Sequence, residues 1–315
     1  MPTDQQRFLN EDQVRAVLSY KELIPVIRQA LMDVSAGRVQ QPLRMVMPVS
    51  PHNGWFALMP AVYGSVMGAK LVTFYPGNAG LHKHTHNAMI QLFRADTGEP
   101  LAMMDGRLIT EMRTAAVSAV AVGHLAPREA KVLAILGSGV QARSHVQALA
   151  EVGSFKEIYV WSRSQDHARV FAAEVGAQVF ATVEKAVEGA DVVLTLTSAS
   201  EPILLGRWLK KSALVCAVGA VTPQRRELDD EAMRGAVVVE SRESAASEPG
   251  DILLANAKVT AEIGELLNGV ALGAQDRPII FKSVGIAIED IATAQFVYAQ
   301  TTAGRGQEFE ETFGK

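Results

Sequence analysis

The stretch from residue 131 to residue 163 constrains the fold more than any other part of this chain. A short apolar run of β type comes first, two glycines separated by one serine follow, and a helical pattern then leads to a second β-type run. Strand, glycine turn, helix and strand in this order form a βαβ unit, whose first turn here carries a G-x-G-x-x-A motif. Gly137 permits the sharp exit from the strand, Gly139 leaves space for a pyrophosphate beside the backbone, and Ala142 lets the helix pack closely. The stretch therefore predicts a dinucleotide site; the alternative is a glycine turn that binds nothing.

The end of the second β-type run indicates which dinucleotide is bound. NAD-binding proteins place an acidic residue there, about 20 residues after the glycines, to bond the ribose 2′-hydroxyl. Here the run ends in Ser162, Arg163 and Ser164, and no carboxylate follows before Asp166. A guanidinium and hydroxyls suit a 2′-phosphate, although an arginine at a strand end can also be simply solvated. The sequence predicts NADPH as the preferred cofactor, with NADH as a weaker alternative.

The remaining patterns predict two domains. After residue 163, strand and helix patterns alternate, which is typical of a doubly wound parallel sheet of Rossmann type. The expected helices are 168–175 and 183–189, and the expected strands are 178–182, 191–197, 214–219 and 237–240. Before residue 131, helical patterns at 11–36 precede short β-type runs between 41 and 93, which predict a separate antiparallel sheet, and a helix is expected at 114–125. A helical run at 286–298 is expected to return to the first domain. The predicted α/β fold is thus a Rossmann-type domain of residues 116–284 inserted into an α+β domain of residues 1–115 and 285–315.

Composition excludes several classes of protein. The chain has 315 residues, which is enough for two cores. Its net charge of −4 and the lack of a basic patch interleaved with aromatics argue against a nucleic-acid partner. We find no apolar run of membrane-spanning length and no signal-peptide pattern at the N-terminus. Cys216, the only cysteine, lies in an apolar run and is expected to be a buried, inert thiol. These features predict a cytoplasmic protein without a membrane partner.

Three cations are candidates for binding an acidic substrate: Arg44, Lys70 and Arg113. An arginine offers a two-pronged donor to a carboxylate, and a lysine offers a point charge that can also act as an acid. Each could equally be a solvated charge at a strand edge. Lys70 stands between Ala69 and Leu71, where an inward-pointing charge would require a partner.

Two further groups of residues have types and positions that could serve chemistry. His82, His84 and His86 have a spacing that would suit a metal site on one face of a strand, but no cysteine or carboxylate cluster accompanies them. A solvated loop is the better interpretation, so no metal is predicted. The hydroxyls at 197–198 and Val218 end two successive predicted strands, at the edge where ligands bind in open α/β sheets.

Four segments resemble the ornithine cyclodeaminase/μ-crystallin family. They are residues 104–121 (MDGRLITEMRTAAVSAVA), 135–145 (ILGSGVQARSH), 217–230 (AVGAVTPQRRELDD) and 281–290 (FKSVGIAIED). The resemblance covers almost the whole chain. It implies a homodimer, in which the first domain binds substrate and makes the dimer contact while the Rossmann-type domain holds the nucleotide.

The same resemblance implies a role for individual residues. The residues around the substrate carboxylate would be Arg44, Lys70 and Arg113, with Glu248 in the ligand pocket. Those near both cofactor and substrate would be Thr85, His86, Arg113 and Thr114. The pyrophosphate would be held by Ser138, Val140 and Gln141, next to Gly137 and Gly139 of the motif. The 2′-phosphate would be held by Ser162, Arg163 and Ser164. The nicotinamide side would be bordered by Thr197, Ser198, Val218 and Ser283.

One departure from the family pattern bears on the reaction. Ornithine cyclodeaminases carry an aspartate shortly before the proline of the loop at 219–223, and this chain has Val221 there. A valine transfers no proton, so ornithine cyclisation is disfavoured. We therefore expect NAD(P)H-dependent reduction of a cyclic ketimine carboxylate, such as Δ1-pyrroline-2-carboxylate or Δ1-piperideine-2-carboxylate, to the cyclic amino acid. In this hypothesis Arg44 and Arg113 fix the carboxylate, and Lys70 orients it or supplies a proton. The alternatives are an ornithine cyclodeaminase, an alanine-type amino-acid dehydrogenase, and a non-catalytic, crystallin-like protein that binds NADPH.

Overall fold

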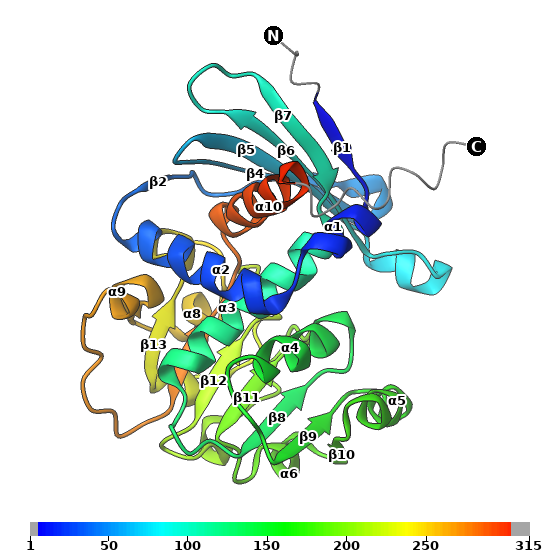
Figure 1. Ribbon diagram of the computed structural model, residues 1–315. Coiled ribbons are helices and arrows are strands. Elements are labelled where there is room, and N and C mark those ends of the chain that lie inside the picture. Colours follow the sequence, from blue (N-terminus) through cyan, green and yellow to red (C-terminus); the bar gives the residue numbers. More distant parts are fainter. Residues whose placement is uncertain (1–5, 304–315) are drawn as a thin grey trace. The chain divides into compact units, whose positions relative to one another are not determined.

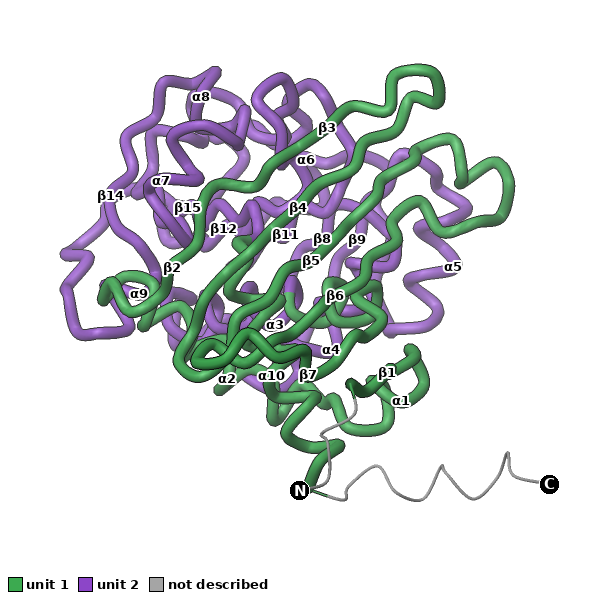
Figure 2. Tube along the Cα trace, turned by 90° about the horizontal axis from the view of Figure 1, so that it is seen from above, with its two compact units in different colours: residues 1–113, 286–315 green, residues 114–285 purple. Residues whose placement is uncertain are grey.

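The computed structural model describes residues 6–303, and the chain divides into two compact units. Unit 1 contains residues 1–113 and 286–315, and unit 2 contains residues 114–285 (Figure 2). Unit 2 is therefore inserted in the chain of unit 1. The expected boundaries, 115/116 and 284/285, lie within two residues of these divisions.

Unit 1 is built on one sheet in the order β1-β7-β6-β5-β4-β2, with β3 also paired to β4. The strands are β1 (Arg7–Leu9), β2 (Val39–Gln40), β3 (Met45–Val49), β4 (Gly54–Tyr63), β5 (Val66–Phe74), β6 (His86–Arg94) and β7 (Pro100–Asp105). All pairs are antiparallel except β1 with β7, which is parallel. The sequence patterns had not indicated β1 or β7.

Helices cover one face of this sheet. They are α1 (Glu11–Val17), α2 (Tyr20–Ser35) and α10 (Ala287–Thr302), and α10 packs on β4, β5, β6 and α2 (Figure 1). Their starts are encoded locally, because Asn10 and Ser19 each accept a hydrogen bond from a backbone N–H of the first turn. Along β5, Val66, Lys70 and Val72 are buried while Leu71 is exposed, so Lys70 lies on the helix-covered face.

Unit 2 contains an eight-stranded sheet in the order β10-β9-β8-β11-β12-β15-β13-β14, and every pair in it is parallel. The strands are β8 (Val132–Leu136), β9 (Glu157–Trp161), β10 (Gln178–Val179), β11 (Val192–Thr195), β12 (Leu214–Ala217), β13 (Ala236–Val239), β14 (Val259–Glu262) and β15 (Ile279–Lys282). The strand order reverses between β8 and β11, as in the doubly wound sheets that bind dinucleotides. The Rossmann-type fold predicted from the sequence is confirmed. The late strand β15 inserts between β12 and β13, which the sequence had not indicated.

The helices of unit 2 connect these strands. They are α4 (Val140–Ala150), α5 (Gln165–Val175), α6 (Val183–Val187), α7 (Arg242–Ala245), α8 (Gly250–Ala255) and α9 (Ile263–Leu267), and α3 (Arg107–Leu125) leads in from unit 1. Helix α3 was expected to start at residue 114. It starts at 107 because the Asp105 carboxylate accepts a hydrogen bond from the Arg107 N–H at 2.9 Å. Strand β11 ends two residues earlier than expected, because the Thr197 N–H turns to Glu227 instead of a neighbouring strand.

Candidate active site

A pocket of about 340 Å³ lies in unit 2 at the carboxyl ends of its strands. It is lined by Gly137, Ser138, Gly139, Trp161, Ser162, Arg163, Ser164, His167, Leu196, Thr197, Ser198, Ala199 and Ile203. These residues follow β8, β9 and β11, so the pocket lies where the strand order reverses. Ligands of open α/β sheets bind at this position.

The structure requires glycine at one of the two glycine positions of the turn and leaves open space at the other. Gly137 has φ = +120°, and a Cβ there would lie 2.6 Å from the Leu196 carbonyl oxygen, so the fold itself requires glycine. Gly139 has an ordinary φ of −85°, and a Cβ there would meet no protein atom within 4 Å. No contact among residues 6–303 explains the second glycine. The open space beside it, at the start of α4, suits the approach of a pyrophosphate to the backbone.

Polar contacts hold the end of β9 against the glycine turn. The Ser138 hydroxyl donates to that of Ser162 at 3.0 Å, and the Gly137 N–H donates to the Trp161 carbonyl at 2.9 Å. Ser164 caps α5 by accepting the His167 N–H at 3.3 Å. Arg163 is exposed in the pocket wall between them. A guanidinium and three hydroxyls are therefore gathered at the place where the ribose 2′ position is expected.

The floor of this pocket depends on a buried carboxylate that the sequence patterns did not single out. Glu227 accepts hydrogen bonds from the Thr195 hydroxyl (2.7 Å), the Thr197 N–H (2.8 Å) and hydroxyl (2.6 Å), and the Gly219 N–H (2.8 Å). Burial raises the pKa of Glu227, while the Lys282 ammonium and these donors lower it. Glu227 thereby ties the turns after β11 and β12 together. Glu227 stands in the charged loop segment 224–230 (QRRELDD), so no local pattern distinguishes it from its solvated neighbours.

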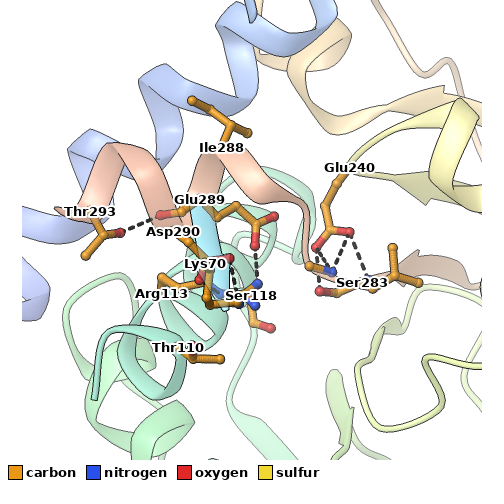
Figure 3. A network of polar contacts seen from close by, with 12 residues as sticks. Lys70, Thr110, Arg113, Ser118, Glu240, Ser283, Ile288, Glu289, Asp290 and Thr293 are labelled. Atoms are coloured by element: carbon orange, nitrogen blue, oxygen red, sulfur yellow. Dashed lines mark hydrogen bonds and ion pairs between the residues drawn. The ribbon is translucent and has the colours of Figure 1, made fainter. Parts of the chain in front are cut away.

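A second buried carboxylate performs a similar task for the end of β15. Glu240 accepts hydrogen bonds from the Ser283 hydroxyl and from the Val284 and Gly285 N–H groups (Figure 3). Ser283, which the sequence analysis placed beside the nicotinamide, is 1% exposed and holds this turn.

Unit 1 contains a cluster of buried ionisable side chains on the helix-covered face of its sheet (Figure 3). The Lys70 Nζ lies 2.6 Å from the Asp290 Oδ2, and the Arg113 Nε donates to the Asp290 Oδ1 at 3.1 Å. Arg113 also pairs with Glu289 through its Nη1 group. All four side chains are at most 6% exposed. The structure thus brings Lys70 and Arg113 together through Asp290, a residue whose role the sequence analysis missed.

The surroundings of Lys70 explain its electrostatics. Its neighbours across the sheet are Met59 and Ile90, both buried and apolar. Burial, opposed by Asp290 and assisted by the Arg113 and Arg44 charges, lowers the pKa of Lys70 to about 7. The same burial, with the Lys70 and Arg113 charges, lowers the pKa of His86 to about 4, so that imidazole is neutral near pH 7. A lysine with this pKa can both donate and accept a proton near neutral pH.

The other predicted site residues lie outside these two groups. Arg44 precedes β3 and is half-buried, and its charge acts on Lys70. Thr85 directly precedes β6, and Thr114 lies within α3. Four other residues predicted to lie in the site do not line the pocket described above: Val140, Gln141, Val218 and Glu248. Val140 is 55% exposed, Gln141 and Glu248 are half-buried, and Val218 is buried. Their roles remain predictions.

The three histidines at 82–86 do not share a strand face. His82 ends the 3-10 helix Pro76–Leu81 in a left-handed conformation, and only His86 belongs to β6. Among residues 6–303, no group of three His, Cys, Asp or Glu side chains is placed to hold a metal ion. Within the same range, no helix has the length and apolarity required to cross a membrane.

Comparison with known proteins identifies the family. A family model described as the ornithine cyclodeaminase/mu-crystallin family matches residues 4–305. The chain belongs to this family. The resemblance stated from the sequence motifs is thus confirmed, and it extends over nearly the whole chain.

Relatives and solved structures of this family cover the chain almost completely. Ketimine reductase mu-crystallin from Rattus norvegicus is 44% identical over 307 residues, covering 95% of this chain and 98% of the relative. A Thermococcus litoralis Δ1-pyrroline-2-carboxylate reductase, solved with NADH and L-proline, matches with a TM-score of 0.89 and 32% identity over 95% of this chain and 98% of that one. An archaeal alanine dehydrogenase dimer with bound NAD also matches with a TM-score of 0.89, at 28% identity over 95% of this chain and 96% of that one.

Proposed function

We propose that this protein reduces the C=N bond of a cyclic ketimine carboxylate to give a cyclic amino acid. The observation that carries the proposal is the buried cluster in which Lys70, with a pKa near 7, pairs with Asp290 beside Arg113. The two cations of this cluster are balanced by Asp290 and Glu289, and Arg44, whose charge acts on Lys70, adds a further cation. Together they offer cationic donors to a small acidic substrate and one exchangeable proton to its nitrogen. Two relatives are named for this chemistry, the rat ketimine reductase and the Thermococcus litoralis reductase bound to L-proline.

Each side chain has a separate task in this reaction. The guanidinium groups of Arg44 and Arg113 bind the substrate carboxylate and fix the orientation of the ring. The Lys70 ammonium donates a hydrogen bond to the imine nitrogen and makes the adjacent carbon more electrophilic. When bound, a reduced nicotinamide cofactor supplies the hydride that this carbon accepts. The neutral His86 adds no competing charge.

The glycine turn of unit 2 is proposed to hold the dinucleotide. Ser138, the open space at Gly139 and the N-terminus of α4 suit the pyrophosphate. Ser162, Arg163 and Ser164 suit a 2′-phosphate, so we propose NADPH as the preferred form and NADH as the weaker one.

The cofactor preference is tested with Arg163→Ala. This variant should raise the KM for NADPH much more than the KM for NADH, since only NADPH carries the phosphate that the guanidinium would bind. An equal increase in the KM for NADPH and for NADH would show that Arg163 does not bind the 2′-phosphate.

A second candidate is an amino-acid dehydrogenase that works through an open-chain imine. It is favoured by the likeness to the archaeal alanine dehydrogenase. Ornithine cyclisation is less well supported, because Val221 in the loop after β12 provides no proton-transferring group.

One assay separates these functions. NADPH oxidation is followed with Δ1-pyrroline-2-carboxylate, with Δ1-piperideine-2-carboxylate and with pyruvate plus ammonia. Ornithine cyclisation consumes no cofactor overall, so it is followed as ammonia release from ornithine in the presence of oxidised cofactor. The proposal expects turnover with at least one cyclic imine and a much lower rate with pyruvate and ammonia. Faster turnover of the open-chain pair would identify the dehydrogenase, and NADPH binding without any reduction would refute the enzyme assignment.

The proposed assembly is a homodimer formed through unit 1, which would then bind substrate as well as the partner. The face of its sheet opposite α10 carries exposed apolar side chains on neighbouring strands: Met45, Met47, Leu71 and Met89. The strand register sets Leu71 beside Leu58 and Met89, so these side chains form a continuous patch. A second copy of the same chain would bury it.

A further inference from the structure

Asp290 occupies the centre of the buried cluster in unit 1. Its two carboxylate oxygens are divided between two cations, Oδ2 lying 2.6 Å from the Lys70 Nζ and Oδ1 3.1 Å from the Arg113 Nε. These three side chains come from α10, β5 and α3, and Lys70 and Asp290 are at most 1% exposed (Figure 3). The carboxylate therefore holds both cations at one place in the fold.

The backbone favours a negative charge at this position. Helix α10 begins at Ala287, so Asp290 lies in its first turn, where the unpaired N–H groups and the helix dipole stabilise an anion. Arg113 has a second buried carboxylate, that of Glu289, in addition to Asp290. Among residues 6–303, Lys70 forms an ion pair with one carboxylate, that of Asp290. A buried ammonium without its partner would lose its proton or its position.

We infer that Asp290 is the positioning residue that keeps Lys70 protonated and aimed for proton donation during imine reduction. This inference rests on the proposed function. In the step itself, a Lys70 N–H bond breaks and an N–H bond forms on the imine nitrogen. The hydride and its two electrons come from the reduced nicotinamide, and Lys70 regains its proton from solvent. Asp290 touches neither substrate nor cofactor in this scheme; it acts through Lys70.

The charged groups that act on Lys70 come from three other parts of unit 1, whereas its neighbour on β4, Met59, is apolar. Asp290 on α10 raises the pKa of Lys70, whereas Arg113 on α3 and Arg44 before β3 lower it. His86 at the start of β6 is neutral near pH 7, because its pKa is about 4. Removing the Asp290 charge should therefore lower the pKa of Lys70. Less of the protonated amine is then present to donate a proton to the imine.

The first test is the pH dependence of kcat/KM for reduction of the cyclic imine. Wild-type activity should fall as pH rises through the pKa of Lys70, near 7. Asp290→Asn should move this fall to lower pH by about 1 to 3 units, the usual effect of removing an adjacent opposite charge. The matched control is Glu289→Gln, which removes the neighbouring carboxylate from Arg113 and should lower the rate with a much smaller displacement of the profile.

Outcomes of this test separate positioning from a merely structural role. A uniform loss of rate at every pH, or equal displacement in Asp290→Asn and Glu289→Gln, would overturn the inference. Asp290→Glu keeps the charge, so its profile should lie nearer to the wild type than that of Asp290→Asn. Failure of the wild-type protein to reduce any imine would instead reject the proposed function.

A second test needs no activity. Urea unfolding of the wild type, Lys70→Met, Asp290→Asn and the double variant forms a double-mutant cycle. Asp290→Asn leaves the Lys70 ammonium without a carboxylate, whereas Lys70→Met leaves Asp290 still paired with Arg113. The double variant should therefore unfold at a higher urea concentration than Asp290→Asn. Additive losses would show that the two side chains are not coupled, and the inference would fail.

Discussion

Gly139→Ala is expected to weaken NADPH binding while leaving the fold of unit 2 almost unchanged. The φ of −85° is accessible to alanine, and the added Cβ meets no protein atom within 4 Å. Alanine is a poorer N-cap than glycine, but it also reduces the entropy of the unfolded chain, so the net change in unfolding free energy should stay within about 1 kcal/mol. The methyl group would instead occupy the space proposed for the pyrophosphate. Each backbone hydrogen bond lost to that anion is worth about 1.5–3 kcal/mol, or roughly tenfold to a hundredfold in Kd.

Gly137→Ala is the matched comparison, because the same substitution two residues earlier meets a different environment. The φ of +120° strains any side chain, and the Cβ would lie 2.6 Å from the Leu196 carbonyl oxygen. Backbone strain of about 1–3 kcal/mol and a similar cost of displacement should lower the unfolding free energy by about 2–6 kcal/mol.

Urea unfolding and titration with NADPH, both followed by tryptophan fluorescence, measure the two effects separately. The expected pattern is a stable Gly139→Ala protein that binds poorly and a destabilised Gly137→Ala protein. Wild-type affinity for NADPH in Gly139→Ala would refute the reasoning, since the open space would then not be where the pyrophosphate binds.

Three further predictions concern other parts of the structure. The pKa of Lys70 is about 7 in the folded protein, against an ordinary value of 10.5, so between pH 7 and pH 10.5 the unfolded chain binds more protons than the folded one. The unfolding free energy of the wild type should therefore rise with pH in this window, relative to that of Lys70→Met. Urea unfolding at several pH values measures this difference. Glu227→Gln replaces one acceptor oxygen by an NH₂ group, which leaves a donor such as the Gly219 N–H unsatisfied and should cost about 1–3 kcal/mol of unfolding free energy, measured by urea titration. Leu71→Lys should shift the proposed dimer toward monomer, as measured by sedimentation velocity. The control Val170→Lys, at another exposed apolar site on α5, should leave the dimer unchanged. Identical sedimentation profiles for the two variants would exclude the sheet face that carries Leu71 as the dimer contact.

The residues that surround the glycine turn could be brought together from the sequence because their signal is local. The glycine spacing, the apolar run before it and the serines and arginine after β9 lie within 34 residues, and each acts through the backbone or side chains of that same segment. The pocket accordingly gathers Gly137, Ser138, Gly139 and the 162–164 segment, all of which the sequence analysis named. Whether they bind NADPH stays a prediction until the binding experiments are done.

By itself the sequence determined the family, the Rossmann-type unit with its glycine turn, and the three cations as candidates for an acidic substrate. Only the tertiary structure decided that Lys70 and Arg113 share one carboxylate, that this carboxylate is Asp290, and that Glu227 ties two strand ends together. Arg113 and Asp290 are 177 residues apart, and no local pattern relates them. Their pairing follows from α10 packing on the sheet of unit 1, where a charge removed from water is stable only beside an opposite charge.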